Sequence, residues 1–257
     1  MSILHFVLGT LVGSFLGVVI LRLGDGKSGI VAGRSECPQC GRKLGAFELI
    51  PVLSYVFQSG KCRGCGKKIG IFYPLIEIVT GVVFVLGLIY SSTLPENTYW
   101  DLVLGLLVLI SFFDLRYKVL PDAFSYVGMG LVVFGWILGY GTGVSGSVVG
   151  ALIFAVFFGM QIWISKETWL GWGDLFLGIF LGMLLGYPQT LLGLFLGYLL
   201  GAVTGVSLIA GGYMDRKSQI PFAPFLCLGA LVALLWGDAI ITYYWNCLGL
   251  GMCDYGI

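Results

Sequence analysis

Long apolar stretches separated by short polar segments occupy almost the whole chain. A helix that crosses a membrane needs about 20 predominantly apolar residues. Eight stretches are that long or nearly so, at about 3–22, 74–91, 99–115, 123–141, 146–165, 170–187, 189–210 and 222–245. Only Gly186-Tyr187-Pro188-Gln189 divides the sixth from the seventh, and proline there favours a tight turn. The pattern predicts an all-α polytopic membrane protein with about eight transmembrane helices.

The composition supports this class. The chain is 58% hydrophobic and 11% charged, whereas soluble domains carry about 25% charged residues. The first apolar stretch has no basic residue before it and no clear small-residue cleavage site after it, so we interpret it as a spanning helix rather than a signal peptide. His5 is the single histidine, which argues against chemistry built on histidine bases.

Lysine and arginine orient the chain, because they gather on the cytoplasmic side of membrane proteins. With the N-terminus outside, the inside segments are 22–73, 116–122, 166–170 and 211–221, and the C-terminus also lies outside. All fourteen basic residues then lie inside: Arg22, Lys27, Arg34, Arg42, Lys43, Lys61, Arg63, Lys67, Lys68, Arg116, Lys118, Lys166, Arg216 and Lys217. A helix count that differed by one would scramble this sorting.

Four regions follow from this organisation. They are a first transmembrane helix (1–22), a cytoplasmic loop (23–73), a seven-helix membrane core (74–246) and an external tail (247–257). Eight of the fourteen cations lie between Lys27 and Lys68. We expect them to fix the topology and to contact anionic lipid headgroups. No aromatic stacking platform accompanies them, so nucleic acid is not an expected partner.

Paired cysteines in the loop have the spacing of a metal site. Cys37-Pro-Gln-Cys40 and Cys62-Arg-Gly-Cys65 are separated by 21 residues, and each is followed by glycine and basic residues. Two CxxC knuckles of this kind predict a structural zinc site with four thiolate ligands. The loop is too small to build its own core, so a metal would stabilise it.

Three other cysteines have less specific surroundings. Cys247 and Cys253 lie in the predicted external tail, where a disulfide and two free thiols are equally compatible with the sequence. Cys227 lies within the last apolar stretch and is most simply a small buried residue.

Two aspartates lie at the ends of apolar stretches, where a carboxylate is costly and is usually kept for a task. Asp114 ends the third predicted helix and Asp174 begins the sixth, so the topology places both near the cytoplasmic membrane boundary. Two close carboxylates hold one proton between them, and the pair can activate a water and protonate a carbonyl oxygen. This chemistry requires neither a metal nor a histidine.

Each aspartate also has a purely structural interpretation. Asp174 in Gly171-Trp172-Gly173-Asp174 could cap a helix N-terminus, although the two glycines would also let another chain approach. Asp114 could pair with Arg116 or Lys118 at a helix end. Asp122, after Pro121, is predicted to cap the fourth helix, with a secondary role near the site.

Glycines recur every four residues at Gly9, Gly13 and Gly17, and again along 178–186 and 193–205. This spacing puts small residues on one helix face and predicts close helix packing in lipid.

Taken together, the ordered motifs resemble those of the bacterial type IV prepilin leader peptidases, membrane aspartic proteases of the GxGD type. The resemblance covers almost the whole chain. The matching segments are Gly13-Ser14-Phe15-Leu16 with Arg22-Leu23, both CxxC knuckles, Glu48 to Tyr55, Tyr73 to Glu77 with Thr80-Gly81, Asp114 with Leu120-Pro121-Asp122, Gly171 to Asp174, and Ile220 to Leu226.

The resemblance implies an intramembrane aspartic endopeptidase with Asp114 and Asp174 as the catalytic pair. Such enzymes remove the short basic leader of prepilins and pseudopilins at the cytoplasmic face of the bacterial inner membrane. Many also methylate the new N-terminal amine with S-adenosylmethionine. Gly171, Gly173, Pro121, Asp122, Glu77 and Pro221 are the expected supporting residues. Glu77 would bind a leader lysine or the new amine, or it would pair with a loop lysine.

Some positions depart from the usual family pattern. Gly17 stands where many members have asparagine, Phe176 where many have lysine, and Ile71-Phe72 where Ser-Arg is common. The N-terminal departures bear on methylation more than on proteolysis. Two other functions fit parts of the sequence: a transporter whose carboxylates relay protons or cations, and a membrane scaffold that docks through its basic loop. The transporter would account for the buried acids but not for the cysteine knuckles or the glycines before Asp174. In the scaffold, the two aspartates would be unrelated helix caps.

Overall fold

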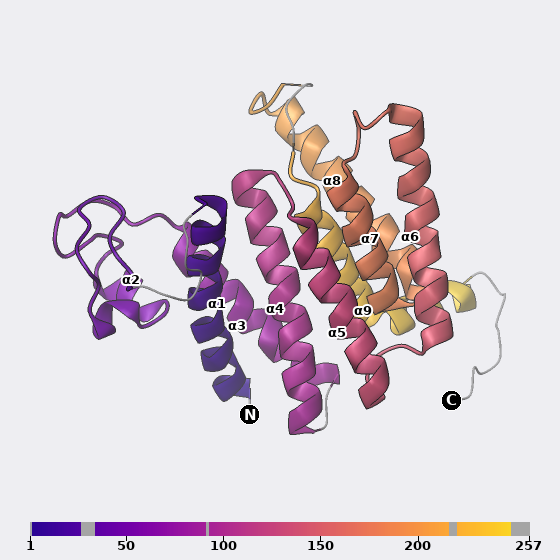
Figure 1. Cartoon of the computed structure of the whole chain (residues 1–257), viewed down its shortest axis with the longest axis horizontal. Coiled ribbons are helices and arrows are strands. Elements are labelled where there is room, and N and C mark those ends of the chain that lie inside the picture. Colours follow the sequence, from indigo (N-terminus) through magenta and orange to yellow (C-terminus); the bar gives the residue numbers. More distant parts are fainter. Residues whose placement is uncertain (1, 27–33, 91–92, 216–219, 248–257) are drawn as a thin grey trace. The chain divides into compact units, whose positions relative to one another are not determined.

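A computed structural model describes residues 2–26, 34–90, 93–215 and 220–247 (Figure 1). Over these residues the chain is helical, without a β-strand beyond two isolated bridges. In chain order the elements are α1 (Ser2–Gly24), η1 (Ala46–Leu49), α2 (Leu53–Phe57), α3 (Phe72–Gly87), η2 (Leu88–Tyr90), α4 (Leu94–Tyr117), α5 (Asp122–Leu138), α6 (Val144–Ser165), α7 (Trp172–Leu185), α8 (Gln189–Ala210) and α9 (Ala223–Cys247). The all-helical prediction is confirmed.

The chain forms two compact units, Met1–Tyr117 and Lys118–Ile257. The N-terminal unit holds α1 to α4 with the cysteine-bearing loop, and the C-terminal unit holds α5 to α9. This boundary lies just after α4, inside the predicted membrane core (74–246), and matches none of the boundaries between the four predicted regions. The four-region division of the sequence therefore stays a prediction.

Glycines of α1 let it pack closely along α3 within the N-terminal unit. A Cβ atom added at Gly9 would lie 2.7 Å from the Cα of Gly81, and one at Gly13 would lie 2.8 Å from the Cα of Glu77. Both distances are too short for any side chain. Gly17 is looser, because its Cβ would meet Ile76 at an ordinary 3.5 Å. The predicted glycine ridge is thus confirmed for its first two members.

Helix α7 is the centre of the C-terminal unit, where it contacts α5, α6, α8 and α9. It crosses α6 where Gly182 meets Gly150, and a Cβ at Gly182 would lie 2.3 Å from the carbonyl oxygen of Gly150. Phe158 and Phe180 fill the surrounding core without exposed surface. The close packing predicted for this glycine series is confirmed at Gly178 and Gly182, whereas Gly186 lies just past the end of α7.

All eight predicted apolar stretches are helices, but they differ in length. Five are long and apolar enough to cross a membrane: α1, α4, α6, α8 and α9. The apolar helices α3, α5 and α7 are shorter, with 16, 17 and 14 residues. At about 1.5 Å per residue, α7 reaches about 21 Å, less than the roughly 30 Å of a hydrocarbon core. The end of α7 is fixed by Gly186, whose φ of +67° cannot continue a helix.

Candidate functional site

Two cysteine hairpins with the same internal hydrogen bonds form the loop of the N-terminal unit. In the first, the N–H of Cys37 donates to the carbonyl of Arg42, and the N–H of Gly41 donates back to Cys37. In the second, Cys62 and Lys67 make the first of these bonds, and Gly66 makes the second. Gly41 and Gly66 both have a φ of +69°, which a side chain would disfavour. The CxxCG sequence therefore folds twice into one turn.

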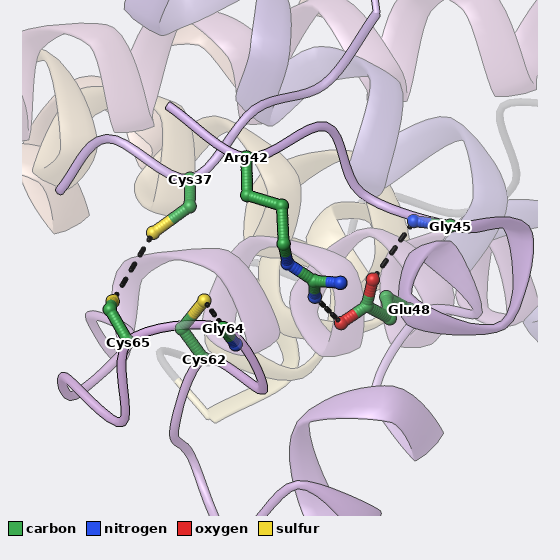
Figure 2. Close-up of polar contacts among 7 residues, drawn as sticks. All are labelled: Cys37, Arg42, Gly45, Glu48, Cys62, Gly64 and Cys65. Carbon is green, nitrogen blue, oxygen red and sulfur yellow. Dashed lines mark hydrogen bonds and ion pairs between the residues drawn. The ribbon is translucent and has the colours of Figure 1, made fainter. Parts of the chain in front are cut away.

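The hairpins bring their four cysteines together. The Sγ atoms of Cys37, Cys40, Cys62 and Cys65 all lie within 4.8 Å of one another. Cys37 and Cys65, one from each hairpin, have their sulfurs 4.0 Å apart (Figure 2). A tetrahedral zinc with Zn–S bonds of about 2.3 Å needs sulfurs about 3.8 Å apart, so a small contraction would let all four bind one ion. The residues present therefore fit the predicted metal site.

Backbone N–H groups prepare one of the thiols for ligation. The N–H groups of Cys65 and Gly64 lower the pKa of Cys62 to about 6, and the Gly64 nitrogen lies 3.3 Å from the Cys62 sulfur. At Cys40 the backbone of Arg42 lowers the pKa, but burial and the neighbouring thiols outweigh it and raise the pKa to about 11. Four thiols crowded together resist full ionisation, and a cation at their centre would relieve that repulsion.

Side chains outside the cysteines hold the loop in shape. Arg42 of the first hairpin forms an ion pair with Glu48, whose other carboxylate oxygen accepts the Gly45 N–H at 2.9 Å (Figure 2). The Gly45 N–H, followed by Arg42, lowers the pKa of Glu48. Lys67 donates to Gln39 at 3.0 Å and links the two hairpins.

Glu77 attaches the loop to the helices of its unit. It is buried in the second turn of α3, and its Oε2 accepts the backbone N–H of Val52 at 2.7 Å. Ser14 of α1 is also hydrogen-bonded to this carboxylate. Sequence reasoning expected a positive group or a lysine at Glu77 and missed this backbone contact, because nothing in the sequence marks which N–H reaches α3.

Val52 has an unusual backbone conformation next to this anchor. Its φ is +60° and its ψ is −52°, and the N–H of Leu53 donates to the carbonyl of Pro51 at 2.5 Å. These values define a γ-turn with positive φ, which is rare and strained for a β-branched residue. Such a conformation persists only where the surrounding structure enforces it.

Asp114 lies in the last turn of α4 and is 7% exposed. The predicted position at a helix end is therefore confirmed for Asp114, and its carboxyl group is buried within the N-terminal unit.

The starts of α5 and α7 meet in the C-terminal unit. A Cβ at Gly173 would lie 3.0 Å from the carbonyl oxygen of Leu120 and 3.6 Å from an oxygen of Asp122. Glycine thus lets the Leu-Pro-Asp and Gly-Trp-Gly-Asp motifs pack closely where they touch. Asp122 is the first residue of α5, and Pro121 occupies the N-cap position without a side-chain cap. The predicted capping role of Asp122 is therefore wrong, while its place beside the second motif is supported.

Asp174 lies in the first turn of α7, and its Oδ2 accepts the N–H of Gly171 at 3.4 Å. Gly171 occupies the N-cap position and Asp174 is the third residue of the helix, so Asp174 is not the N-cap, although its carboxylate contacts the N-cap N–H. Asp174 is half-buried at the junction with α5. Two residues later Phe176 packs against Tyr126 of α5, with ring centroids 5.2 Å apart. The lysine common in related motifs is here replaced by an aromatic contact between α5 and α7.

Pro221 precedes α9 and is half-buried. The neighbouring Phe222 packs against Tyr198 of α8, with ring centroids 5.1 Å apart. Of the remaining predicted features, Cys227 is buried in α9 as expected, and Cys247 is the exposed last residue of that helix. Cys253, with which Cys247 could form the disulfide considered from the sequence, lies outside the described residues. Lys27, Arg216 and Lys217 also lie outside them.

Comparison with known proteins covers both units. The family model described as "Bacterial Peptidase A24 N-terminal domain" matches residues 7–91, and that described as "Type IV leader peptidase family" matches residues 102–206. A protein of Aeromonas salmonicida (strain A449) named "Prepilin leader peptidase/N-methyltransferase" is 32% identical over 94% of this chain and 92% of its own length. The chain belongs to the type IV leader peptidase family.

Other relatives carry the same name. The Bacillus subtilis (strain 168) protein is 31% identical over 93% of this chain and 96% of its own length. The Pseudomonas putida protein is 33% identical over 95% of this chain and 93% of its own length. No solved structure gives a significant match. The leader peptidase family therefore includes this chain over nearly its full length, with the cysteine loop inside the first matched region and both aspartates inside the second.

Proposed function

We propose that this protein is an intramembrane aspartic endopeptidase that removes the basic leader of prepilin or pseudopilin proteins. The observation that carries the proposal is family membership over more than nine-tenths of the chain, together with the names of the relatives. The buried or half-buried carboxylates at helix ends supply acid–base groups of the kind this hydrolysis needs.

Asp114 and Asp174 act as the catalytic pair, with one proton between them. The ionised carboxylate takes a proton from water as the water oxygen adds to the scissile carbonyl carbon. The protonated carboxyl group gives its proton to the carbonyl oxygen. Breaking the C–N bond then needs one proton on the leaving amine, which the first carboxyl group returns. The second carboxylate takes a hydroxyl proton from the tetrahedral intermediate as the intermediate collapses, so the pair again holds one proton. Gly173 supports this role, because it lets the start of α7, which carries Asp174, pack closely against Leu120 and Asp122.

The membrane topology has eight spans, with both termini outside and the active site near the cytoplasmic face of the inner membrane. Five helices are long enough to cross alone, and α3, α5 and α7 complete the set where flanking residues and local thinning of the bilayer compensate for their length. The clustering of all fourteen basic residues in four alternate segments supports this count.

One zinc ion is held by Cys37, Cys40, Cys62 and Cys65. Four thiolates close the coordination sphere, so the ion has a structural role and supplies no step of the hydrolysis. N-methylation of the new terminus with S-adenosylmethionine is supported by the names of the relatives. Gly17 and Ile71-Phe72, which depart from the usual pattern, lie in the first matched region.

The test uses purified protein in phospholipid vesicles and a prepilin-like peptide. Asp114→Asn and Asp174→Asn are each expected to lower the cleavage rate by at least about a hundredfold, because each removes half of the acid–base pair. Asp238→Asn is the matched control, since Asp238 is exposed in α9 and bonded to Gln189.

Mass spectrometry of the product reports the cut site and any added methyl group together. Normal cleavage in either catalytic variant would refute the assigned pair. An ion flux that both variants abolish, in protein without peptidase activity, would favour the transporter instead.

A further inference from the structure

The loop of the N-terminal unit carries an apolar surface that its own fold does not cover. We call residues 46–57, from η1 through α2, the apolar arm. Neither helix of the arm has a buried residue. Phe47 and Phe57 are 80% and 78% exposed, and four further large apolar side chains of the arm are at least 40% exposed: Leu49, Ile50, Leu53 and Val56. An exposed apolar cluster of this kind marks a binding surface.

The anchor at Glu77 sets the depth of the arm relative to α3. The Val52 N–H, in the middle of the arm, is bonded to Glu77 at 2.7 Å. Glu77 is the sixth residue of α3, so this bond lies about 7 Å along the helix from its first residue. If α3 enters the bilayer at its start, the arm lies at the boundary between headgroups and acyl chains, where interfacial helices insert about 5–10 Å.

The strained γ-turn makes this attachment specific. Buried Pro51 and the positive φ of Val52 reverse the chain between η1 and α2, and the bond to Glu77 holds that reversal. The turn therefore brings η1 and α2 into contact with each other.

The charge of the surrounding loop favours an anionic membrane surface. The hairpins and the arm, residues 34–70, contain seven basic and two acidic side chains. The segment stays cationic even after the two negative charges that a four-thiolate zinc site would add. Basic residues beside an apolar surface are the combination that binds anionic lipid headgroups.

We infer that the apolar arm inserts into the cytoplasmic lipid interface, with Phe47, Leu53, Val56 and Phe57 among the acyl chains and the hairpin lysines and arginines on anionic headgroups. Two further apolar side chains are exposed at the start of α3, those of the N-cap residue Ile71 and of Leu75. The inference depends on the chain being embedded in a membrane and not on the proposed peptidase activity.

Site-directed spin labelling of the full-length protein tests the inference. A nitroxide at Phe57→Cys is compared with one at Ser59→Cys. Ser59 is an exposed polar residue two positions beyond Phe57, the last residue of the arm. Cys227, Cys247 and Cys253 are replaced beforehand, and zinc protects the four hairpin cysteines, so the parent without a new cysteine must take no label. The protein is placed in phosphatidylcholine vesicles that contain phosphatidylglycerol.

In these vesicles, the nitroxide at position 57 should collide severalfold more often with oxygen than with a water-soluble nickel reagent. The nitroxide at position 59 should collide less often with oxygen than with the nickel reagent. Replacing phosphatidylglycerol with phosphatidylcholine should lower the ratio at 57. Strong nickel access at 57 would show the arm in water and overturn the inference. Low access to both reagents would show a covering protein and overturn it equally. An unchanged ratio without phosphatidylglycerol would overturn its electrostatic part. A label at Phe47→Cys gives a second reading if position 57 disturbs zinc retention.

Discussion

Two carboxylates of this protein, those of Glu77 and Asp174, accept hydrogen bonds from backbone N–H groups. Glu77 accepts the Val52 N–H from the loop, and Asp174 accepts the Gly171 N–H at the start of its own helix. Both contacts join a carboxyl oxygen to a main-chain donor, and such a hydrogen bond is stronger when the carboxyl group is ionised. A carboxylate in an apolar helix thus fixes backbone geometry in addition to any chemistry.

The first prediction concerns Glu77. Glu77→Ala removes the acceptor of the Val52 N–H and should destabilise the attachment of the loop by about 1–3 kcal/mol. Glu77→Gln keeps an acceptor oxygen and should lose less. The measurement is the rate of proteolytic cutting within residues 34–70 of the folded protein, which should rise in the order wild type, Gln, Ala. Equal rates for all three would show that Glu77 does not anchor the loop.

At the scale of elements, the protein uses two ways of fixing a turn or a crossing. The cysteine hairpins repeat one hydrogen-bond pattern, so that two short segments without a core present four sulfurs to one point. The membrane helices use glycine contacts instead, as at the crossing of α6 and α7. In lipid, helix association depends on close packing because the acyl chains are as apolar as the side chains.

Metal content tests the hairpins. Cys65→Ser should lose the zinc that the wild-type protein binds in a ratio of one per chain, because three thiolates leave the coordination sphere open. Cys227→Ala changes a buried cysteine of α9 and should keep the metal. Elemental analysis of the purified proteins measures the ratio. Full zinc in the Cys65 variant would contradict a four-thiolate site.

Two glycine substitutions compare a crowded site with an open one. Gly182→Ala places a methyl group against the backbone of Gly150 and should destabilise the C-terminal unit by about 1–3 kcal/mol. Gly130→Ala in α5 meets nothing within 4 Å and should be neutral or stabilising by up to about 1 kcal/mol. Thermal unfolding followed by circular dichroism gives both shifts, and a melting temperature that is unchanged by Gly182→Ala would disprove the tight crossing.

For the whole molecule, the family relationship and the distribution of charge agree. Relatives align over more than nine-tenths of the chain, so the proposed function applies to the chain as a whole rather than to one unit. The basic residues gather in alternate segments between the apolar helices. Together these features are those of a membrane enzyme with several apolar helices.

The topology gives the fourth prediction. Ser145→Cys, at the start of α6, should react with a membrane-impermeant thiol reagent added outside spheroplasts. Glu167→Cys, just after α6, should react only after the membrane is opened. The reason is that a positive-inside chain with eight spans puts these positions on opposite faces. Native cysteines are replaced by serine except for the four in the hairpins, and labelling of both positions from one side would refute the eight-span arrangement.

The sequence alone determined the helical class, the position of each apolar helix and the grouping of four cysteines into two CxxC knuckles. These features depend on local composition and on short spacings, which any fold of the chain must respect. The ordered motifs also indicated the family, because the comparison with known proteins depends on the same sequence similarity.

Only the tertiary structure decided which segments distant in sequence meet. It shows that Gly173 touches Leu120, that Glu77 holds Val52 in a strained turn, and that Asp122 begins α5 without capping it. It also shows that α3, α5 and α7 are shorter than a full membrane width. The physical reason is that a helix end and a side-chain partner depend on packing against other elements, and no local pattern encodes the identity of that neighbour.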